Sequence, residues 1–143
     1  MKLHLNNRPD LVLVHSCVVD RDESNTASDA HESHAGEGHA RYRIRIAENW
    51  YKQSLILTSR SVDLWDIDNV SDLSTAHFQR LADLKAEVVI LGTGKCIVFP
   101  HSAIIQPLMQ KHIGLEVMDT GAACRTYNIL ADDGRRVVAC LLI

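Results

Sequence analysis

Two apolar segments in the second half of the chain, each running into a small polar turn, constrain the fold more than any other feature. The first reads VVILGTGKCIVFP over residues 88–100, and the second reads GLEVMDTGAACRTYN over residues 114–128. A short all-apolar strand is typical of a sheet that is covered on both faces. In an open α/β sheet, the turns at the carboxyl ends of such strands are where sites are usually built. Residues 92–95 and 119–125 are therefore the turns to inspect for function.

The segments between and around these strands have helical spacing. Ser74 can cap a helix whose apolar face is predicted to contain Phe78, Leu81 and Leu84. Pro107 requires the next helix either to start near Ile104 or to bend, and Gly114 is expected to end it. A third helix follows residue 119, and RRVVACLLI closes the chain as a strand. The second half is thus predicted to be a β-α-β-α-β unit with helices packed on a sheet.

The first half has the pattern of antiparallel strands. LVLVHSCVV over residues 11–19 is rich in β-formers, and apolar residues alternate with arginines over residues 42–46. Asn49 is predicted to lie in a hairpin turn before the strand YKQSLILT. The expected fold class is α/β: a single domain over residues 1–143, three-layer β+β/α with a mixed central sheet, antiparallel N-terminal strands and the C-terminal β-α-β-α-β unit.

Residues 20–41 differ from the rest, because alanine is nearly the only apolar residue and six acids face two arginines. Such a segment cannot bury enough apolar surface to offset its ordering entropy, so we expect a disordered, His-rich loop insertion. Its His31, His34 and His39 could bind a transition metal weakly. Their H-x2-H-x4-H spacing matches no closed zinc pattern, and a solvated insertion is the simpler interpretation.

Composition excludes several classes of protein. The net charge of −3 and the pI near 6.2 argue against a nucleic-acid-binding protein. No apolar run approaches the ~20 residues of a membrane-spanning helix. The N-terminal sequence has no signal-peptide pattern, so a cytoplasmic location is expected. The cysteines lack metal-finger spacing and are expected to be free thiols: Cys17, Cys96, Cys124 and Cys140.

The two apolar segments, the closing ILADDGRRVVACLL, the initial MKLHL and the strand YKQSLILT together resemble a known family. It is a widespread family of small α/β proteins of unknown function in bacteria and archaea, whose mitochondrial member is a complex I assembly factor. The resemblance covers nearly the whole chain except residues 20–41. It implies the three-layer fold and no established enzymatic activity. It also implies a role in binding, since the mitochondrial relative binds a partner assembly factor and respiratory-complex subunits.

The turn formed by Gly92, Thr93, Gly94 and Lys95 has two readings. Glycines after a strand allow positive φ and close approach to a ligand, and Lys95 could neutralise a phosphate or carboxylate. The motif is neither G-x-G-x-x-G nor a complete P-loop. The other reading is a tight turn at the end of the strand.

The second turn also has two readings. Asp119 or Thr120 satisfies backbone N–H groups as a helix cap, and Arg125 pairs internally. Alternatively, those N–H groups, Arg125 and Lys95 form an anion pocket. Cys124 lies in the first turns of the same helix, where a thiol pKa is lowered, but a cysteine on an apolar helix face is more often a small core residue.

Two functions remain open. The first is a non-catalytic binding or assembly-type protein, acting on a respiratory or other protein complex, with a protein partner that the sequence does not identify. The second is a small-molecule or anion-binding protein, with or without catalysis, whose site is formed by residues 92–95 and 119–125. No cofactor motif is complete and no catalytic residue is assigned, and the oligomeric state is not predicted.

Overall fold

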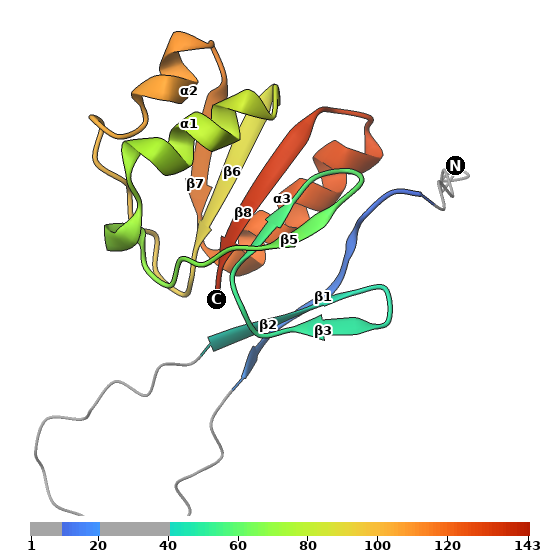
Figure 1. Ribbon diagram of the computed structural model, residues 1–143. Helices are drawn as coiled ribbons and strands as arrows, with labels where there is room; N and C mark the ends of the chain where they lie inside the picture. The colour runs from blue at the N-terminus through green and yellow to red at the C-terminus, as the bar shows by residue number, and fades with distance from the viewer. Residues whose placement is uncertain (1–9, 21–40) are drawn as a thin grey trace, which may run out of the picture.

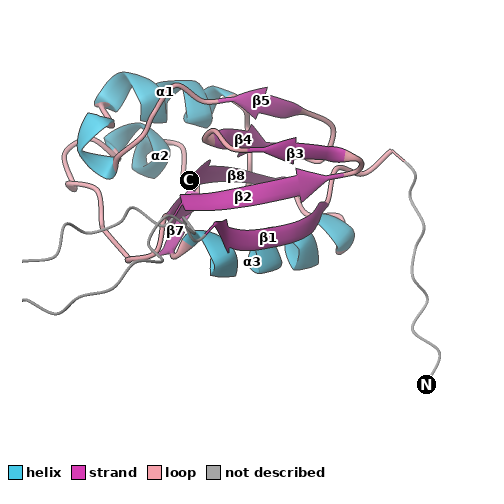
Figure 2. Cartoon of the chain, turned by 90° about the horizontal axis from the view of Figure 1, so that it is seen from below, coloured by secondary structure: helices cyan, strands magenta, loops and turns pink. Residues whose placement is uncertain are grey.

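The computed structural model describes residues 10–20 and 41–143 and contains two sheets (Figures 1 and 2). The smaller sheet consists of antiparallel β1 (Val14–Asp20), β2 (Arg41–Ile46) and β3 (Asn49–Tyr51), in that order. Asp20 lies opposite Arg41, so both ends of the predicted loop belong to paired strands. The rest of that loop, with His31, His34 and His39, lies outside the described residues.

The larger sheet has five strands in the order β5-β4-β8-β6-β7. These are β4 (Leu55–Leu57), β5 (Val62–Leu64), β6 (Val88–Thr93), β7 (Gly114–Met118) and β8 (Val137–Leu142). β6 is parallel to β7 and β8, whereas β4 is antiparallel to β5 and β8. The central sheet is therefore mixed, as predicted, and β6-α2-β7-α3-β8 forms the predicted β-α-β-α-β unit.

Helices cover both faces of this sheet. A 3₁₀ helix (Val70–Asp72), α1 (Thr75–Asp83) and α2 (Gln106–Gln110) lie on one side, and α3 (Thr120–Asp132) lies on the other side with β1 and β2 (Figure 1). All six residues of β8 are buried. Val137, Ala139 and Leu141 pack into the apolar cluster that includes residues of α3. The alternate residues of the strand pack into the cluster that includes residues of α1. This strand separates two apolar cores, which confirms the predicted α/β layers.

Four local predictions were wrong. Asn49 begins β3, because the hairpin turn lies at residues 47–48, where Ala47 has a φ of 50°. The segment YKQSLILT is not one strand, since β3 ends at Tyr51 and β4 begins at Leu55 in the other sheet. Gly114 is the first residue of β7 and does not end α2.

The fourth wrong prediction is Leu84, which is the exposed C-cap of α1 and lies outside its apolar face. The predicted cap of the same helix is confirmed, since Ser74 and His77 form a capping box. Pro107 lies at the start of α2, where a backbone N–H has no partner within the helix, so the lack of an N–H costs no hydrogen bond.

Candidate functional site

The two turns that the sequence singled out lie side by side. β6 and β7 are neighbouring parallel strands, with Gly92 opposite Met118, so their carboxyl ends meet at one edge of the sheet. The Gly94 N–H donates to Thr120 Oγ1 at 2.8 Å, and the Thr120 N–H donates to the Gly94 carbonyl at 2.9 Å. The fold thus brings residues 92–95 into direct contact with the start of α3.

The first N–H groups of α3 already have partners within the protein. The Ala122 N–H donates to Asp119 Oδ1 at 2.8 Å, and the Ala123 N–H donates to the Asp119 carbonyl at 2.9 Å. The Thr120 N–H donates to the Gly94 carbonyl, so three of the first four N–H groups of the helix are paired within the protein. Asp119 therefore has the geometry of an N-cap. An anion at this end of the helix would have to rely mainly on side chains.

Two cationic side chains flank these turns. Lys95 and Arg125 are both exposed, and no carboxylate of residues 10–20 or 41–143 lies within 4.0 Å of either. They are therefore available to an external anion, and the predicted anion site stays a prediction that rests on these two side chains.

The glycines of the first turn have separate structural roles. Gly94 has a φ of 87°, which only glycine adopts without strain. Gly92 is buried against α3, where a Cβ would lie 2.9 Å from the Ala123 Cβ and 3.0 Å from the Thr120 Cα. Thr93 Oγ1 donates to the Cys96 carbonyl at 2.6 Å and accepts the Val98 N–H at 3.0 Å. These contacts fix the turn after β6.

Cys124 has a thiol partner that the sequence analysis did not single out. The Cys124 thiol is buried, and Cys17 on β1 packs against the same apolar cluster. Hydrogen bonding with the Cys17 thiol, together with burial, raises the pKa of Cys124, opposite to the lowering expected near a helix N-terminus. The same hydrogen bond, helped by the Arg125 charge, lowers the pKa of Cys17. The more acidic thiol of the pair is therefore Cys17.

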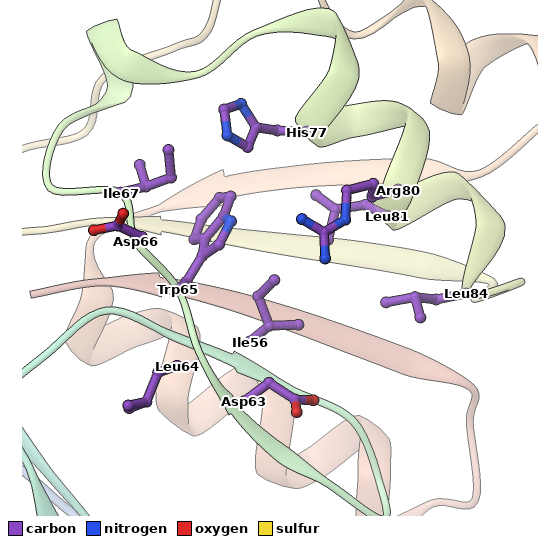
Figure 3. Close-up of a pocket in the computed structure, with 10 residues that line it drawn as sticks. All are labelled: Ile56, Asp63, Leu64, Trp65, Asp66, Ile67, His77, Arg80, Leu81 and Leu84. Atoms are coloured by element: carbon purple, nitrogen blue, oxygen red, sulfur yellow. The ribbon is translucent and has the colours of Figure 1, made fainter.

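A pocket of about 430 Å³ lies beside β5, the edge strand of the larger sheet, between β5 and α1 (Figure 3). The Arg80 side chain extends from α1 into the space beside Trp65. Trp65 and His77 meet edge to face, with ring centroids 6.2 Å apart. The lining combines apolar side chains with groups of both charges: Ile56, Asp63, Leu64, Trp65, Asp66, Ile67, His77, Arg80, Leu81 and Leu84.

The pocket was not predicted, although its signal is visible in the sequence. Asp63 and Asp66 flank Trp65 just before a capped helix. His77 Nδ1 accepts the Ser74 N–H at 3.0 Å, so this nitrogen serves the helix cap. Across residues 10–20 and 41–143, no group of three or more His, Cys, Asp or Glu side chains could hold a metal ion.

A family model described as "Protein of unknown function (DUF498/DUF598)" matches residues 37–142. The chain belongs to this family. The match includes both turns, the pocket residues and the closing strand, so the resemblance seen in the sequence motifs is confirmed.

Relatives of this DUF498 chain carry two different names. It is 33% identical over 88 residues to the human "NADH dehydrogenase [ubiquinone] 1 alpha subcomplex assembly factor 3", covering 60% of this chain and 48% of that protein. It is 28% identical over 105 residues to the "13 kDa major membrane protein" of Francisella tularensis, covering 72% and 83%. The chain spans about half the length of the mammalian relatives it matches.

The fold of the DUF498 chain also occurs in solved structures. A crystal structure of a Bordetella parapertussis protein superposes with a TM-score of 0.69 and 28% identity, over 92% of this chain and 95% of that one. Within the described part of this chain, no helix has the length and apolar character needed to cross a membrane.

Proposed function

We propose that this protein acts by binding another protein, in an assembly-type role and without chemistry of its own. The observation that carries this proposal is an exposed apolar run in the loop between β6 and α2. Ile97 is 55% exposed, Val98 45% and Phe99 74%. Single exposed apolar residues are common on protein surfaces, whereas a contiguous apolar patch marks an interaction surface.

The loop is held in place, which favours binding. The Thr93 hydroxyl fixes the Val98 N–H at 3.0 Å, and the positive φ of Gly94 sets the turn before it. Because the backbone is already ordered, a partner would not have to offset the full entropy of ordering it. Phe99 is an aromatic side chain, the kind that fills a pocket at the centre of an interface.

The relatives support the same class of function. The mammalian and other animal relatives are named as assembly factors of NADH dehydrogenase. We therefore propose that the partner is a protein with an apolar pocket, such as a subunit or assembly factor of a multi-protein complex.

The test compares two exposed apolar residues on different elements. Affinity capture from a lysate of the source cells is quantified for the wild type, Phe99→Ser and Ile129→Ser. Ile129 lies on α3 and is 69% exposed, so its variant has the same chemistry outside the loop. We expect one protein to be enriched by the wild type and Ile129→Ser, and to fall at least tenfold in Phe99→Ser. Equal recovery by both variants, or recovery of the bait alone at low salt, rejects the proposal.

A second candidate function is the binding of a small molecule, which the pocket between β5 and α1 favours. Its volume of about 430 Å³ is within the range of known ligand sites. A thermal-shift screen with nucleotides, phosphates and carboxylates, repeated on Arg80→Ala and Lys95→Ala, separates the possible sites. A hit lost in Arg80→Ala assigns the pocket, a hit lost in Lys95→Ala assigns the predicted anion site, and no hit removes this candidate.

A further inference from the structure

The outer face of the small sheet carries three arginines of one strand. Ile44 and Ile46 of β2 are buried in the apolar core. Because side chains alternate along a strand, Arg41, Arg43 and Arg45 lie on the opposite face. Figure 2 shows this sheet in front of β8, with no described helix lying over it. A chain with a net charge of −3 therefore presents a local concentration of positive charge.

Trp50 of β3 orders two of these arginines. It lies directly opposite Arg45 and is 46% exposed. The guanidinium carbon of Arg43 lies 4.8 Å from the centroid of the indole, and that of Arg45 lies 5.9 Å from it. Both distances are within the range of a cation–π interaction. The two guanidinium groups are therefore held on one aromatic side chain.

The positive charge of this face is only weakly paired within the described part of the chain. Asp20 Oδ1 lies 3.9 Å from Arg43 Nε, and Asp20 Oδ2 lies 4.0 Å from Lys52 Nζ. No described carboxylate lies within 4.0 Å of Arg45. The Nε atoms of Arg43 and Arg45 are covered and have no hydrogen-bond partner among the described residues. An external anion would therefore reach each guanidinium at its Nη end, where N–H groups donate to carboxylates.

The stacking on Trp50 favours an acidic protein segment over a membrane or a nucleic acid. A tryptophan that anchors a protein at a bilayer surface, or that stacks on a base, uses a free ring. Here two guanidinium groups already pack on the ring, so the face presents hydrogen-bond donors. The net charge of −3 also opposes long-range attraction to a polyanionic surface.

The spacing of the arginines fits an extended acidic segment. Residues that share one face of a strand recur at about 6.6 Å, and alternate side chains of any extended chain have the same spacing. We propose that Arg43 and Arg45 bind an extended segment of a protein partner in which acidic residues alternate with other residues. This inference rests on the proposed function, since it gives the chemistry of a second contact with the same kind of partner.

The test compares two fluorescein-labelled peptides of equal charge, each with as many glutamates as serines. The glutamates alternate with serines in the first peptide and are contiguous in the second. Binding to the full chain is measured by fluorescence anisotropy at low ionic strength. The alternating peptide should bind about threefold or more tighter than the contiguous one, because only its carboxylates match the spacing of the arginines. Equal affinity of the two peptides, or no binding of the alternating peptide, overturns the proposal without any variant.

Two double variants locate the binding surface. Arg43→Gln/Arg45→Gln should weaken binding of the alternating peptide by about tenfold, because two charge-assisted contacts are lost. Arg135→Gln/Arg136→Gln removes the same charge from the turn before β8, outside the small sheet, and should leave the affinity unchanged. Equal losses in the two double variants mean that net charge, and not this face, attracts the peptide, which overturns the site.

Other probes decide between classes of partner. Vesicles of phosphatidylcholine with phosphatidylserine, and an oligothymidine with the same number of charges, are titrated in the same buffer. Tighter binding of either one than of the alternating peptide, lost in Arg43→Gln/Arg45→Gln, overturns the assignment to a protein segment. Phe99→Ser should bind the alternating peptide as the wild type does. A failure of the peptide test is thus distinct from a failure of the lysate capture, which depends on Phe99.

The chain's own acids provide the last comparison. Residues 21–40 contain five acidic residues and follow Asp20 directly in the sequence. A full-length variant with amides in place of these five acids is titrated with the alternating peptide beside the wild type. Comparable affinities support an external partner. Binding that occurs only in the amide variant assigns the arginine face to the chain's own acids and overturns the proposal.

Discussion

The Thr120 hydroxyl donates a hydrogen bond of 2.6 Å to the carbonyl of Leu142, which joins the first residue of α3 to the last residue of β8. The same oxygen accepts the Gly94 N–H at 2.8 Å. One fully buried hydroxyl therefore satisfies two backbone groups where β6, β8 and α3 meet. The geometry gives Thr120 a structural role that accounts for its position without a ligand.

Thr120→Val should destabilise the protein by about 2–3 kcal/mol, because it keeps the shape of the side chain but leaves a buried N–H and a buried carbonyl unpaired. Urea denaturation followed by circular dichroism measures this change. Thr120→Ser retains the hydroxyl and should lose clearly less stability. Equal losses in the two variants would mean that the methyl contacts, and not the hydrogen bonds, hold this junction.

Gly92→Ala should cost about 1–3 kcal/mol of stability, because the new Cβ overlaps the Ala123 Cβ and the backbone of Thr120. Gly114→Ala is the matched control, since its Cβ would meet only ordinary contacts, the nearest at 3.8 Å. The urea-unfolding midpoints of Gly92→Ala and Gly114→Ala, compared with that of the wild type, measure the two stability losses. A Gly92→Ala protein as stable as Gly114→Ala would show that α3 can move away from β6 without loss.

The layers of the fold could be predicted because burial leaves a pattern in the sequence. Val88–Leu91 and the closing VVACLL are continuous apolar runs since both faces of these strands are covered. The division of residues 51–58 between two sheets leaves no such pattern. In YKQSLILT the polar residues 52–54 separate two β-prone stretches, but they do not indicate which sheet the second stretch joins. The pairing of β4 with β8, in which Leu55 lies opposite Leu141, assigns it to the larger sheet.

The candidate site was predictable where it depends on strand ends. Adjacent parallel strands place their carboxyl ends together, so the contact of Gly94 with Thr120 follows from topology. The packing of Cys17 near Cys124 does not follow from topology, because it depends on how β1 packs across α3. No spacing rule in the sequence relates these two residues. The pocket beside Trp65 likewise depends on the packing of α1 against β5.

Asn128→Ala should loosen the start of β1. The Asn128 side chain accepts the Val14 N–H at 2.8 Å and donates to the Val14 carbonyl at 2.7 Å, so it pairs with β1 as a neighbouring strand would. Loss of two part-buried hydrogen bonds should cost about 1–2 kcal/mol and accelerate hydrogen exchange at the Val14 amide. Ile129→Ala, the next residue and an exposed one, should leave that exchange rate unchanged. If both variants exchange at the same rate, the side-chain pairing does not hold β1.

The alkylation of Cys17 should titrate at a lower pH in the folded protein than in the unfolded chain. The groups facing this thiol are Cys124, Arg125, Asp119 and Tyr42, and the hydrogen bond from Cys124 is the largest cause of its lowered pKa. Because iodoacetamide reacts with the thiolate, the rate should rise as the pH rises through that lowered pKa. Mass spectrometry of the Cys17 peptide, with Cys96→Ser as background, gives the midpoint.

Two substitutions at Cys124 separate the causes of this shift. Cys124→Ala removes the hydrogen-bond donor, so the Cys17 midpoint should move to higher pH, whereas Cys124→Ser keeps a donor and should hold it low. Arg125→Gln removes a positive charge and should raise the midpoint by a smaller amount. A midpoint in the folded wild type that equals that of the chain in urea, or one that Cys124→Ala leaves unmoved, contradicts the hydrogen-bonded thiol pair. Because Cys124 donates only while it holds its proton, the folded pair should lose one proton readily and retain the second to much higher pH.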